Sequence, residues 1–368
     1  MTQTDTHEAQ RREAFADKLI GDTIAAFELM GTYLGLRLGL YHALDAGGPA
    51  TAADLAARAG IDQRYAREWL EQQAVAGVLE VVLEVAGDPA DHDGRTYALP
   101  SGHREVLVDE LNPYYVAPLA YAAGIGGVLP QLVAAYRTGA GVPFSAYGAD
   151  IRDHIEQLNR PMFINELGPV WLPAIPELDN RLSADPPARV LDIACGAGWS
   201  SIALALAYPN VRIDGLDLDE ASIARASKNA AAAGVGDRVT FRVADAADLV
   251  LSEHYDAVFI FEALHDMAQP VVALAAARDA LRPDGSVIVA DEKVGEQFTA
   301  PGDQIERLMY GFSITHCLPA GRPDADAAAT GTVMRPDTLR AYAQQAGFSS
   351  VEVLPIANDM WRFYRLSD

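Results

Sequence analysis

Cysteine is scarce in this sequence, which has two among 368 residues, Cys195 and Cys317. Two distant cysteines cannot build the disulfide framework of a small secreted domain, and their spacing is not that of a zinc site. We therefore expect no disulfide and no metal, and a reducing cytoplasm as the compartment.

Long apolar runs and an apolar leader are also missing. No uninterrupted apolar stretch approaches the ~20 residues that span a bilayer. The first residues, MTQTDTHEAQRREAF, are polar, so the chain has none of the marks of an exported or anchored protein. We expect no membrane partner.

Basic residues are few relative to acidic ones. The chain has 28 Lys and Arg against 51 Asp and Glu, a formal net charge of −23. Such a charge opposes binding to polyphosphate, so nucleic acid is excluded as the expected substrate. A small molecule, neutral or cationic, is the expected partner.

A strand, a glycine turn and a helix follow one another from residue 189. Val190 to Ile193 is an apolar run typical of a strand buried on both faces. Cys195 to Gly198 forms a tight turn, and Trp199 to Ala207 has the helical period. A second apolar strand, Val211 to Leu216, ends at Asp217, where a carboxylate can accept both hydroxyls of a ribose.

A dinucleotide fold would have a similar outline, but its fingerprint is not met. Counting G-x-G-x-x-G from Gly196 places Ser201 at the third glycine. Residues 192–198 read DIACGAG and resemble the first motif, D-x-G-x-G-x-G, of class I S-adenosylmethionine-dependent methyltransferases, with Ala194 replacing a glycine. The resemblance implies S-adenosylmethionine as cofactor, S-adenosylhomocysteine as product, and these cofactor-binding residues: Asp192, Ala194, Gly196, Gly198, Asp217, Leu218, Asp245, Ala246 and Phe261.

The rest of the C-terminal half alternates strands and helices. Five such alternations predict a mainly parallel sheet with helices on both faces. The fifth predicted strand, Ser286 to Ala290, ends in Asp291 and Glu292, at the edge where ligands of such sheets bind. The last two predicted strands, Val351 to Ile356 and Trp361 to Leu366, form an antiparallel hairpin. This fits the seven-stranded Rossmann-like sheet of the family that the chain resembles.

The N-terminal part predicts a winged-helix domain, preceded by a mobile tail that ends at about Ala14. The helix predicted over Phe15 to Leu44 contains glycines at residues 31, 35 and 39, a spacing that suits either a kinked core helix or a subunit interface. Two short helices follow, and then a β-hairpin whose first strand is predicted over Val78 to Val85. The second of these helices, from Gln63 to Ala76, has no basic stripe. We therefore expect the winged helix to support a homodimer. The predicted parts are a dimerisation domain at 1–108, a helical roof at 109–185, and a cofactor-binding domain at 186–368.

Aromatic residues of the roof, among them Tyr147, Phe163 and Trp171, are candidates for packing on a substrate or for plain core. The stretch Leu264 to Met267, LHDM, is similar to the L-H-D-W segment of small-molecule O-methyltransferases with an N-terminal winged-helix dimerisation domain. In that family the histidine is the general base, which implies this role for His265.

An imidazole can take a proton from a hydroxyl or phenol near neutral pH. The expected catalytic residues are therefore His265, with Glu262 and Glu292 to orient it or the acceptor, and His316 in reserve. A histidine that only caps the next helix is the alternative. The predicted function is O-methylation of a small molecule in secondary metabolism. N- or C-methylation, or a regulator that senses S-adenosylmethionine and binds DNA, stays open.

Overall fold

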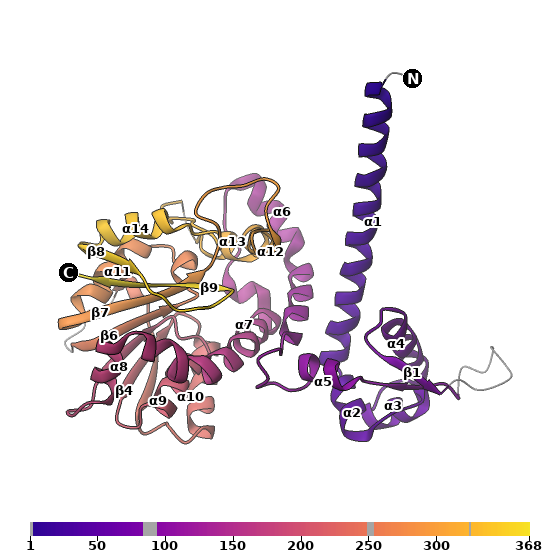
Figure 1. The fold of residues 1–368 in the computed structure, drawn as a ribbon, viewed down its shortest axis with the longest axis horizontal. Helices are drawn as coiled ribbons and strands as arrows, with labels where there is room; N and C mark the ends of the chain where they lie inside the picture. Colours follow the sequence, from indigo (N-terminus) through magenta and orange to yellow (C-terminus); the bar gives the residue numbers. More distant parts are fainter. Residues whose placement is uncertain (1–2, 84–93, 249–253, 324) are drawn as a thin grey trace. The chain divides into compact units, whose positions relative to one another are not determined.

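A computed structural model describes residues 3–83, 94–248, 254–323 and 325–368 (Figure 1). The chain divides into two compact units, residues 1–123 and 124–368. Most of the predicted roof, from residue 124 onward, therefore belongs to the same unit as the sheet.

The first unit is mainly helical with a small two-stranded sheet. Thr51 and Asp54 form a capping box at the start of α3, and the Asp62 carboxylate caps α4, so local sequence sets both boundaries. Its elements are α1 (Gln3–Arg37), α2 (Leu40–Gly47), α3 (Ala52–Ala59), α4 (Gln63–Val75), β1 (Glu80–Leu83), β2 (Thr96–Ala98) and α5 (Ser101–Leu107).

Two predictions for this unit need correction. The residues before Ala14 were expected to be a mobile tail, but α1 begins at Gln3. The predicted strand from Val78 to Val85 is shorter, and its last two residues lie outside the described part of the chain.

The glycines of α1 pack against their own unit. A Cβ at Gly31 would lie 2.5 Å from Gln72, and one at Gly35 would lie 2.5 Å from the Tyr41 ring. The Trp69 indole N–H donates to the Gly31 carbonyl at 2.9 Å. Close approach of α2 and α4 therefore explains these two glycines, while Gly39 takes the left-handed conformation between α1 and α2.

The second unit begins with a helical layer. Its elements include two π-helical stretches, which are η3 and η7. The elements of this layer are α6 (Leu129–Thr138), η2 (Phe144–Tyr147), α7 (Gly148–Met162), η3 (Phe163–Trp171), η4 (Leu172–Ala174), α8 (Pro176–Ser183), α12 (Gln304–Phe312), η7 (Ser313–Cys317) and α13 (Leu318–Ala320). The 3₁₀ segment η1 (Ala117–Val128) crosses the boundary between the units.

The seven-stranded sheet has the order β5-β4-β3-β6-β7-β9-β8. Its first five strands in this order are parallel, and β9 is antiparallel to both of its neighbours. The predicted fold is confirmed. The strands are β3 (Arg189–Ile193), β4 (Arg212–Asp217), β5 (Val239–Val243), β6 (Tyr255–Phe261), β7 (Leu281–Glu292), β8 (Ser350–Val353) and β9 (Trp361–Ser367).

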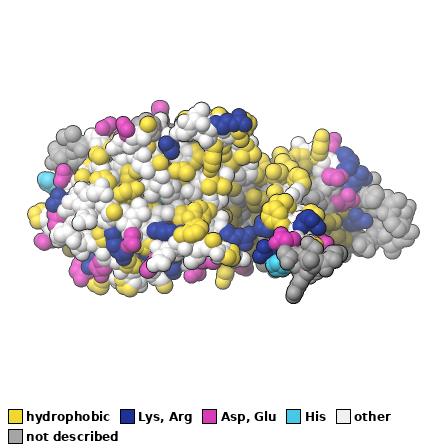
Figure 2. Space-filling view, turned by 90° about the horizontal axis from the view of Figure 1, so that it is seen from above, with side chains coloured by type: hydrophobic (Ala, Val, Ile, Leu, Met, Phe, Trp, Pro, Cys, Tyr) yellow, Lys and Arg dark blue, Asp and Glu magenta, His cyan; other side chains and the backbone are white. Residues whose placement is uncertain are grey.

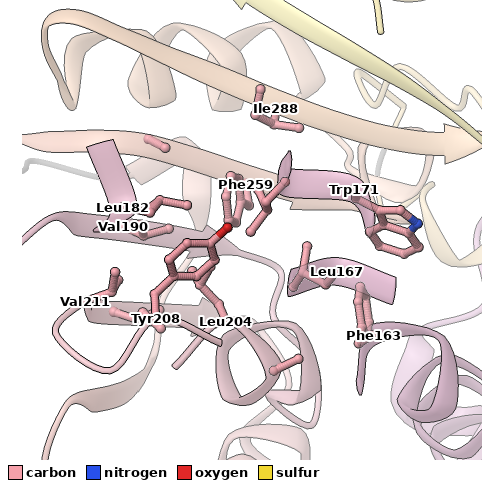
Figure 3. Close-up of a cluster of buried hydrophobic side chains, with 14 of the residues drawn as sticks. Phe163, Leu167, Trp171, Leu182, Val190, Leu204, Tyr208, Val211, Phe259 and Ile288 are labelled. Carbon is pink, nitrogen blue, oxygen red and sulfur yellow. The ribbon is translucent and has the colours of Figure 1, made fainter. Parts of the chain in front are cut away.

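Alternating residues of the central strands enter two separate cores. Val190, Phe259 and Ile288 pack on one face with α8 and α9 (Trp199–Ala207). Their neighbours in sequence pack on the other face with α11 (Pro270–Asp279) and α14 (Pro336–Gln345). A sheet covered on both faces explains why these strands are apolar throughout. Figure 3 shows the first of these cores.

Two helical stretches have a high mean hydropathy. Residues 6–37 and 117–138 are long and apolar enough to cross a membrane by length and composition. The prediction concerned uninterrupted apolar runs, whereas these two helices also contain scattered polar residues. In the first stretch 11% of the apolar window is buried, so its apolar side chains face outward.

Candidate active site

The glycine turn after β3 opens a space at the carboxyl end of the sheet. Ala194, Gly196 and Gly198 all have positive φ, at 58°, 52° and 81°. Glycine adopts this conformation freely, whereas alanine in it costs about 1 kcal/mol. A Cβ at Gly196 would meet no heavy atom within 4 Å. The turn therefore leaves room for a ligand beside Gly196.

Asp192 lies beneath the turn and not in that space. The carboxylate is buried, and its Oδ2 accepts hydrogen bonds from the Ser200 and Ser201 hydroxyls at 2.6 Å each. Burial raises the pKa of Asp192 to about 6, although the two serine hydroxyls oppose the shift. In this structure Asp192 ties β3 to the first turn of α9.

Replacing Asp192 with asparagine should flatten the pH dependence of stability. The pKa of this group is about 6 in the folded chain against 3.8 ordinarily, so the folded state binds its proton more tightly. Stability therefore falls as pH rises through this range, by about 2 kcal/mol between pH 4 and 7. Urea denaturation at pH 4 and pH 7 measures the free energy of unfolding of both proteins. Relative to the wild type, the variant should be more stable at pH 7 than at pH 4 by that amount. A constant difference between the two proteins would contradict this assignment.

Asp217 connects the glycine turn to the end of β4. Its Oδ2 accepts the Gly196 N–H at 2.9 Å and its Oδ1 accepts the Asp219 N–H at 2.8 Å. Burial raises the pKa of Asp217, and the backbone hydrogen bonds oppose that effect. The next residue, Leu218, is 67% exposed. A fixed carboxylate beside an exposed apolar side chain suits a ribose that carries an aromatic base.

The other predicted cofactor residues follow β5 and end β6. The Asp245 side chain is exposed and accepts the Ala247 N–H at 2.8 Å, and Ala246 is buried at the start of a short 3₁₀ turn. The Phe261 ring is buried and stacks on Phe259 with ring centroids 5.1 Å apart. Phe261 can therefore meet a ligand through its backbone but not through its ring.

His265 lies in a short 3₁₀ turn after β6 and is 2% exposed. Its Nδ1 is 2.7 Å from Asp291 Oδ1, and its Nε2 is 3.3 Å from Asp266 Oδ1. Burial works to lower the pKa of His265, but the two carboxylates raise it well above its ordinary value. In the neutral ring, the hydrogen bond to Asp291 places the proton on Nδ1 and leaves the lone pair on Nε2. Because the pKa is raised, the share of this neutral form grows as the pH rises.

Glu262 and Glu292 form a buried acidic pair beside this histidine. Their carboxyl groups share a hydrogen bond, and the Asn159 amide donates to Glu262. Burial raises the pKa of both groups, and for Glu292 the neighbouring Glu262 raises it further. One proton is therefore held between the two carboxyl groups. The structure thus brings the three predicted catalytic residues, His265, Glu262 and Glu292, to one end of the sheet.

The predicted roof aromatics are buried. Trp171 is 1% exposed, and its ring centroid lies 4.8 Å from that of Phe363 in the core. Phe163 packs in the same cluster, which Figure 3 shows. Tyr147 is buried as well and donates its hydroxyl to the Thr315 carbonyl. Of the two sequence-based readings, the structure supports plain core for Phe163 and Trp171.

His316 is also buried in the helical layer. Its ring packs edge-on against Tyr147 with centroids 4.7 Å apart, and burial lowers its pKa. Its Nδ1 lies 3.4 Å from Cys317 Sγ.

Sequence reasoning missed the partners of the predicted residues. Asp291 was noted at the end of its strand but was not paired with His265, although β6 and β7 are neighbours in the predicted sheet. Asn159, Asp266 and Cys317 were not singled out. Only their place in the folded chain brings them to the site.

Comparison with known families identifies both parts of the chain. Residues 184–318 match a methyltransferase domain, and residues 25–109 match an Rv2258c-like winged HTH domain. The first match contains the glycine turn and His265.

Two characterised relatives show similarity in sequence. The chain is 35% identical over 123 residues to 27-O-demethylrifamycin SV methyltransferase of Amycolatopsis mediterranei, covering 32% of this chain and 45% of that protein. It is 29% identical over 274 residues to 3-hydroxy-5-methyl-1-naphthoate 3-O-methyltransferase of Streptomyces sahachiroi, covering 73% of this chain and 74% of that one.

Solved structures show the same fold over the whole chain. Mitomycin 7-O-methyltransferase MmcR has a TM-score of 0.70 and 20% identity, with 97% of this chain and 99% of that chain covered. Human N-acetylserotonin methyltransferase in complex with SAM has a TM-score of 0.68 and 17% identity, with 96% and 97% covered. Residues 184–318 are therefore a methyltransferase domain, and a winged-helix domain precedes it in the chain.

Proposed function

We propose that this enzyme transfers a methyl group to a hydroxyl or phenol oxygen of a small molecule, with S-adenosylmethionine as donor and His265 as general base. The observation that carries this proposal is the pairing of His265 with Asp291 at the carboxyl end of the sheet, in the same unit as the glycine turn.

The residues around the turn fit the cofactor. The space beside Gly196, the carboxylate of Asp217 and the exposed Leu218 offer groups that would hold the amino-acid end, the ribose and the adenine. By the family resemblance, Asp245 and Ala246 meet the adenine. When bound, S-adenosylmethionine supplies an electrophilic methyl on a sulfonium centre. We expect Asp192 and Ala194 to shape the turn, and Phe261 to contribute its backbone.

An oxygen acceptor explains the histidine. A hydroxyl attacks a sulfonium methyl slowly until its proton is removed, whereas a neutral amine already carries a free lone pair. Asp291 keeps the lone pair of His265 on Nε2, as a base requires. Glu262 and Glu292 already share one proton. A second proton taken from the acceptor would break their shared hydrogen bond, so we assign this pair to positioning. The named O-methyltransferase relatives support this choice.

A screen with methyl-labelled cofactor identifies the acceptor. Metabolite extracts and a panel of phenols, aliphatic alcohols and amines are incubated with the enzyme, and labelled products are analysed by mass spectrometry. Label on oxygen supports the proposal. Label only on nitrogen or carbon would move the function to one of the alternatives.

A DNA-binding regulator is disfavoured by charge. On α4, Arg64 is paired with Glu68, and Arg95 lies 3.4 Å from Glu71. On the face that Figure 2 shows, basic and acidic side chains are interspersed. Phosphate binding needs a basic surface. A gel shift with genomic fragments at moderate salt should show no complex, and a retained fragment that responds to S-adenosylmethionine would favour the regulator.

We also propose a homodimer formed through α1. A series of apolar side chains on this helix is exposed, including Phe27 at 65%. A helix that exposes so many apolar side chains is typical of a partner surface. The series is Phe15, Leu19, Ile20, Ile24, Phe27, Met30 and Leu34.

Light scattering should therefore report a particle of twice 39.4 kDa at micromolar concentration. The double variant Ile24→Asp with Phe27→Asp should shift the particle to a monomer, because buried carboxylates without partners are costly. Leu206→Asp, at an exposed apolar position of α9, is the matched control and should stay dimeric. A monomeric wild type would refute the dimer.

A further inference from the structure

Three side chains with different donor atoms meet at the end of β6. The ring of His265, the carboxylate of Asp266 and the thiol of Cys317 place one ligand atom each within 4.8 Å of one another. We propose that these three residues form a binding site for a divalent metal ion, Zn²⁺ in particular. Imidazole, carboxylate and thiolate are the three protein ligands that zinc uses. The sequence alone did not indicate this site because Cys317 is distant in the chain from the other two residues.

The distances agree with two ligands of one ion. His265 Nε2 lies 3.3 Å from Asp266 Oδ1, yet within the described chain that oxygen accepts no hydrogen bond. The two atoms are therefore close without pointing at each other. Two ligands bound at about 2.0 Å in a tetrahedral arrangement lie about 3.3 Å apart. An ion between them explains both the short distance and the missing hydrogen bond.

The surroundings of the three ligands match those of a metal site. Asp291 accepts the Nδ1 proton of His265 at 2.7 Å, and a carboxylate in this place fixes the ring and makes Nε2 a better ligand. Thr332 is buried, and its hydroxyl lies within hydrogen-bonding reach of the Cys317 thiol. A buried hydroxyl in this place can also donate a hydrogen bond to a water bound to the metal, or accept one from it.

Charge favours a cation at this position. Asp266 Oδ1 lies 3.3 Å from His265 Nε2 and Asp291 Oδ1 lies 2.7 Å from its Nδ1, so two carboxylates stabilise positive charge there. The Cys317 thiol is buried in the same cluster. A bound metal ion would displace the proton of the Cys317 thiol. Its charge would then balance the negative charges of this thiolate and of the Asp266 carboxylate. The Asp266 side chain is 32% exposed and provides access from solvent. Three protein ligands leave a fourth position for water.

Bound zinc would also block the proposed base. The lone pair of Nε2 cannot coordinate a metal and accept a proton at once, so zinc should inhibit methyl transfer. This consequence rests on the proposed function, whereas metal binding itself does not. The test below therefore measures binding without an acceptor, and failure of the metal site leaves the methyltransferase proposal untouched.

Cobalt titration of the untagged protein tests the site. Co²⁺ replaces Zn²⁺ in such sites and gives a thiolate-to-cobalt charge-transfer band in the near ultraviolet. We expect this band in the wild type, its loss on addition of Zn²⁺, and its absence in Cys317→Ser. The variant Cys195→Ser alters the other buried thiol and should keep the band.

Two further variants distinguish a metal site from a simple thiol–imidazole contact. Asp266→Asn should weaken Zn²⁺ binding at least 10-fold, because the partly buried carboxylate is a direct ligand. Asp291→Asn should weaken it about 10- to 100-fold through the orientation of His265. Thermal unfolding without metal shows that both variants fold. A wild type without the charge-transfer band, or a band that persists in Cys317→Ser, would overturn the proposal.

Discussion

The variant His265→Gln should turn over about 100 to 10,000 times more slowly than the wild type while binding S-adenosylmethionine with nearly unchanged affinity. Glutamine can still donate a hydrogen bond toward Asp291 but cannot take a proton from the acceptor. The loss should fall on kcat, because the base acts in the transition state and not in cofactor binding. Calorimetry with cofactor and steady-state turnover of the identified acceptor measure the two quantities separately.

A second histidine provides the control. His254 is exposed just before β6, at the opposite end of the strand from His265. His254→Gln should retain normal turnover. A near-normal rate in His265→Gln would eliminate the base and would favour an amine or activated carbon as acceptor, for which alignment alone can provide much of the acceleration.

Asp291→Asn tests whether the base depends on its partner. An asparagine can present its amide to Nδ1 and favour the tautomer with the proton on Nε2. Turnover should therefore fall although His265 is intact, with KM for the acceptor little changed. If Asp291 were only structural, its effect would appear in thermal unfolding and not in kcat.

The central sheet was predictable because its signals are local and strong. Apolar runs that end in acidic residues, with glycines or helices between them, determine β3 to β6 to within about a residue. The strand predicted over Ser286 to Ala290 is only the central part of β7, which runs from Leu281 to Glu292. The N-terminal helix was less predictable. Its first turns are polar and show no helical spacing of apolar residues, and yet the helix begins at Gln3.

The side-chain partners in the site could not be predicted in the same way. Sequence placed His265 and Asp291 at the ends of two strands, but whether their side chains turn toward each other depends on the conformation after β6. Glu262 shows this, since its φ of 51° turns the chain in a direction that few residues other than glycine adopt. Cys317 reaches His265 only because a π-helical stretch packs there.

The variant Asp217→Ala should bind S-adenosylmethionine about 10- to 150-fold more weakly, the equivalent of about 1.5 to 3 kcal/mol for hydrogen bonds to a charged group. Asp217 would lose both its contact with the ribose and the hydrogen bond that holds the Gly196 N–H. Asp237→Ala, at a side chain that is 76% exposed before β5, is the matched control and should keep full affinity.

A cofactor analogue separates these two contributions of Asp217. If the carboxylate binds the ribose hydroxyls directly, the wild type should bind S-adenosylhomocysteine more tightly than its 2′,3′-dideoxy analogue, and Asp217→Ala should lose that preference. If Asp217 acts only by holding the glycine turn, the variant should weaken both ligands equally, because the turn meets the amino-acid end. Calorimetry with both ligands on both proteins gives the coupling free energy directly. Unchanged affinity in the variant, or tight binding of NAD by the wild type, would refute the cofactor assignment.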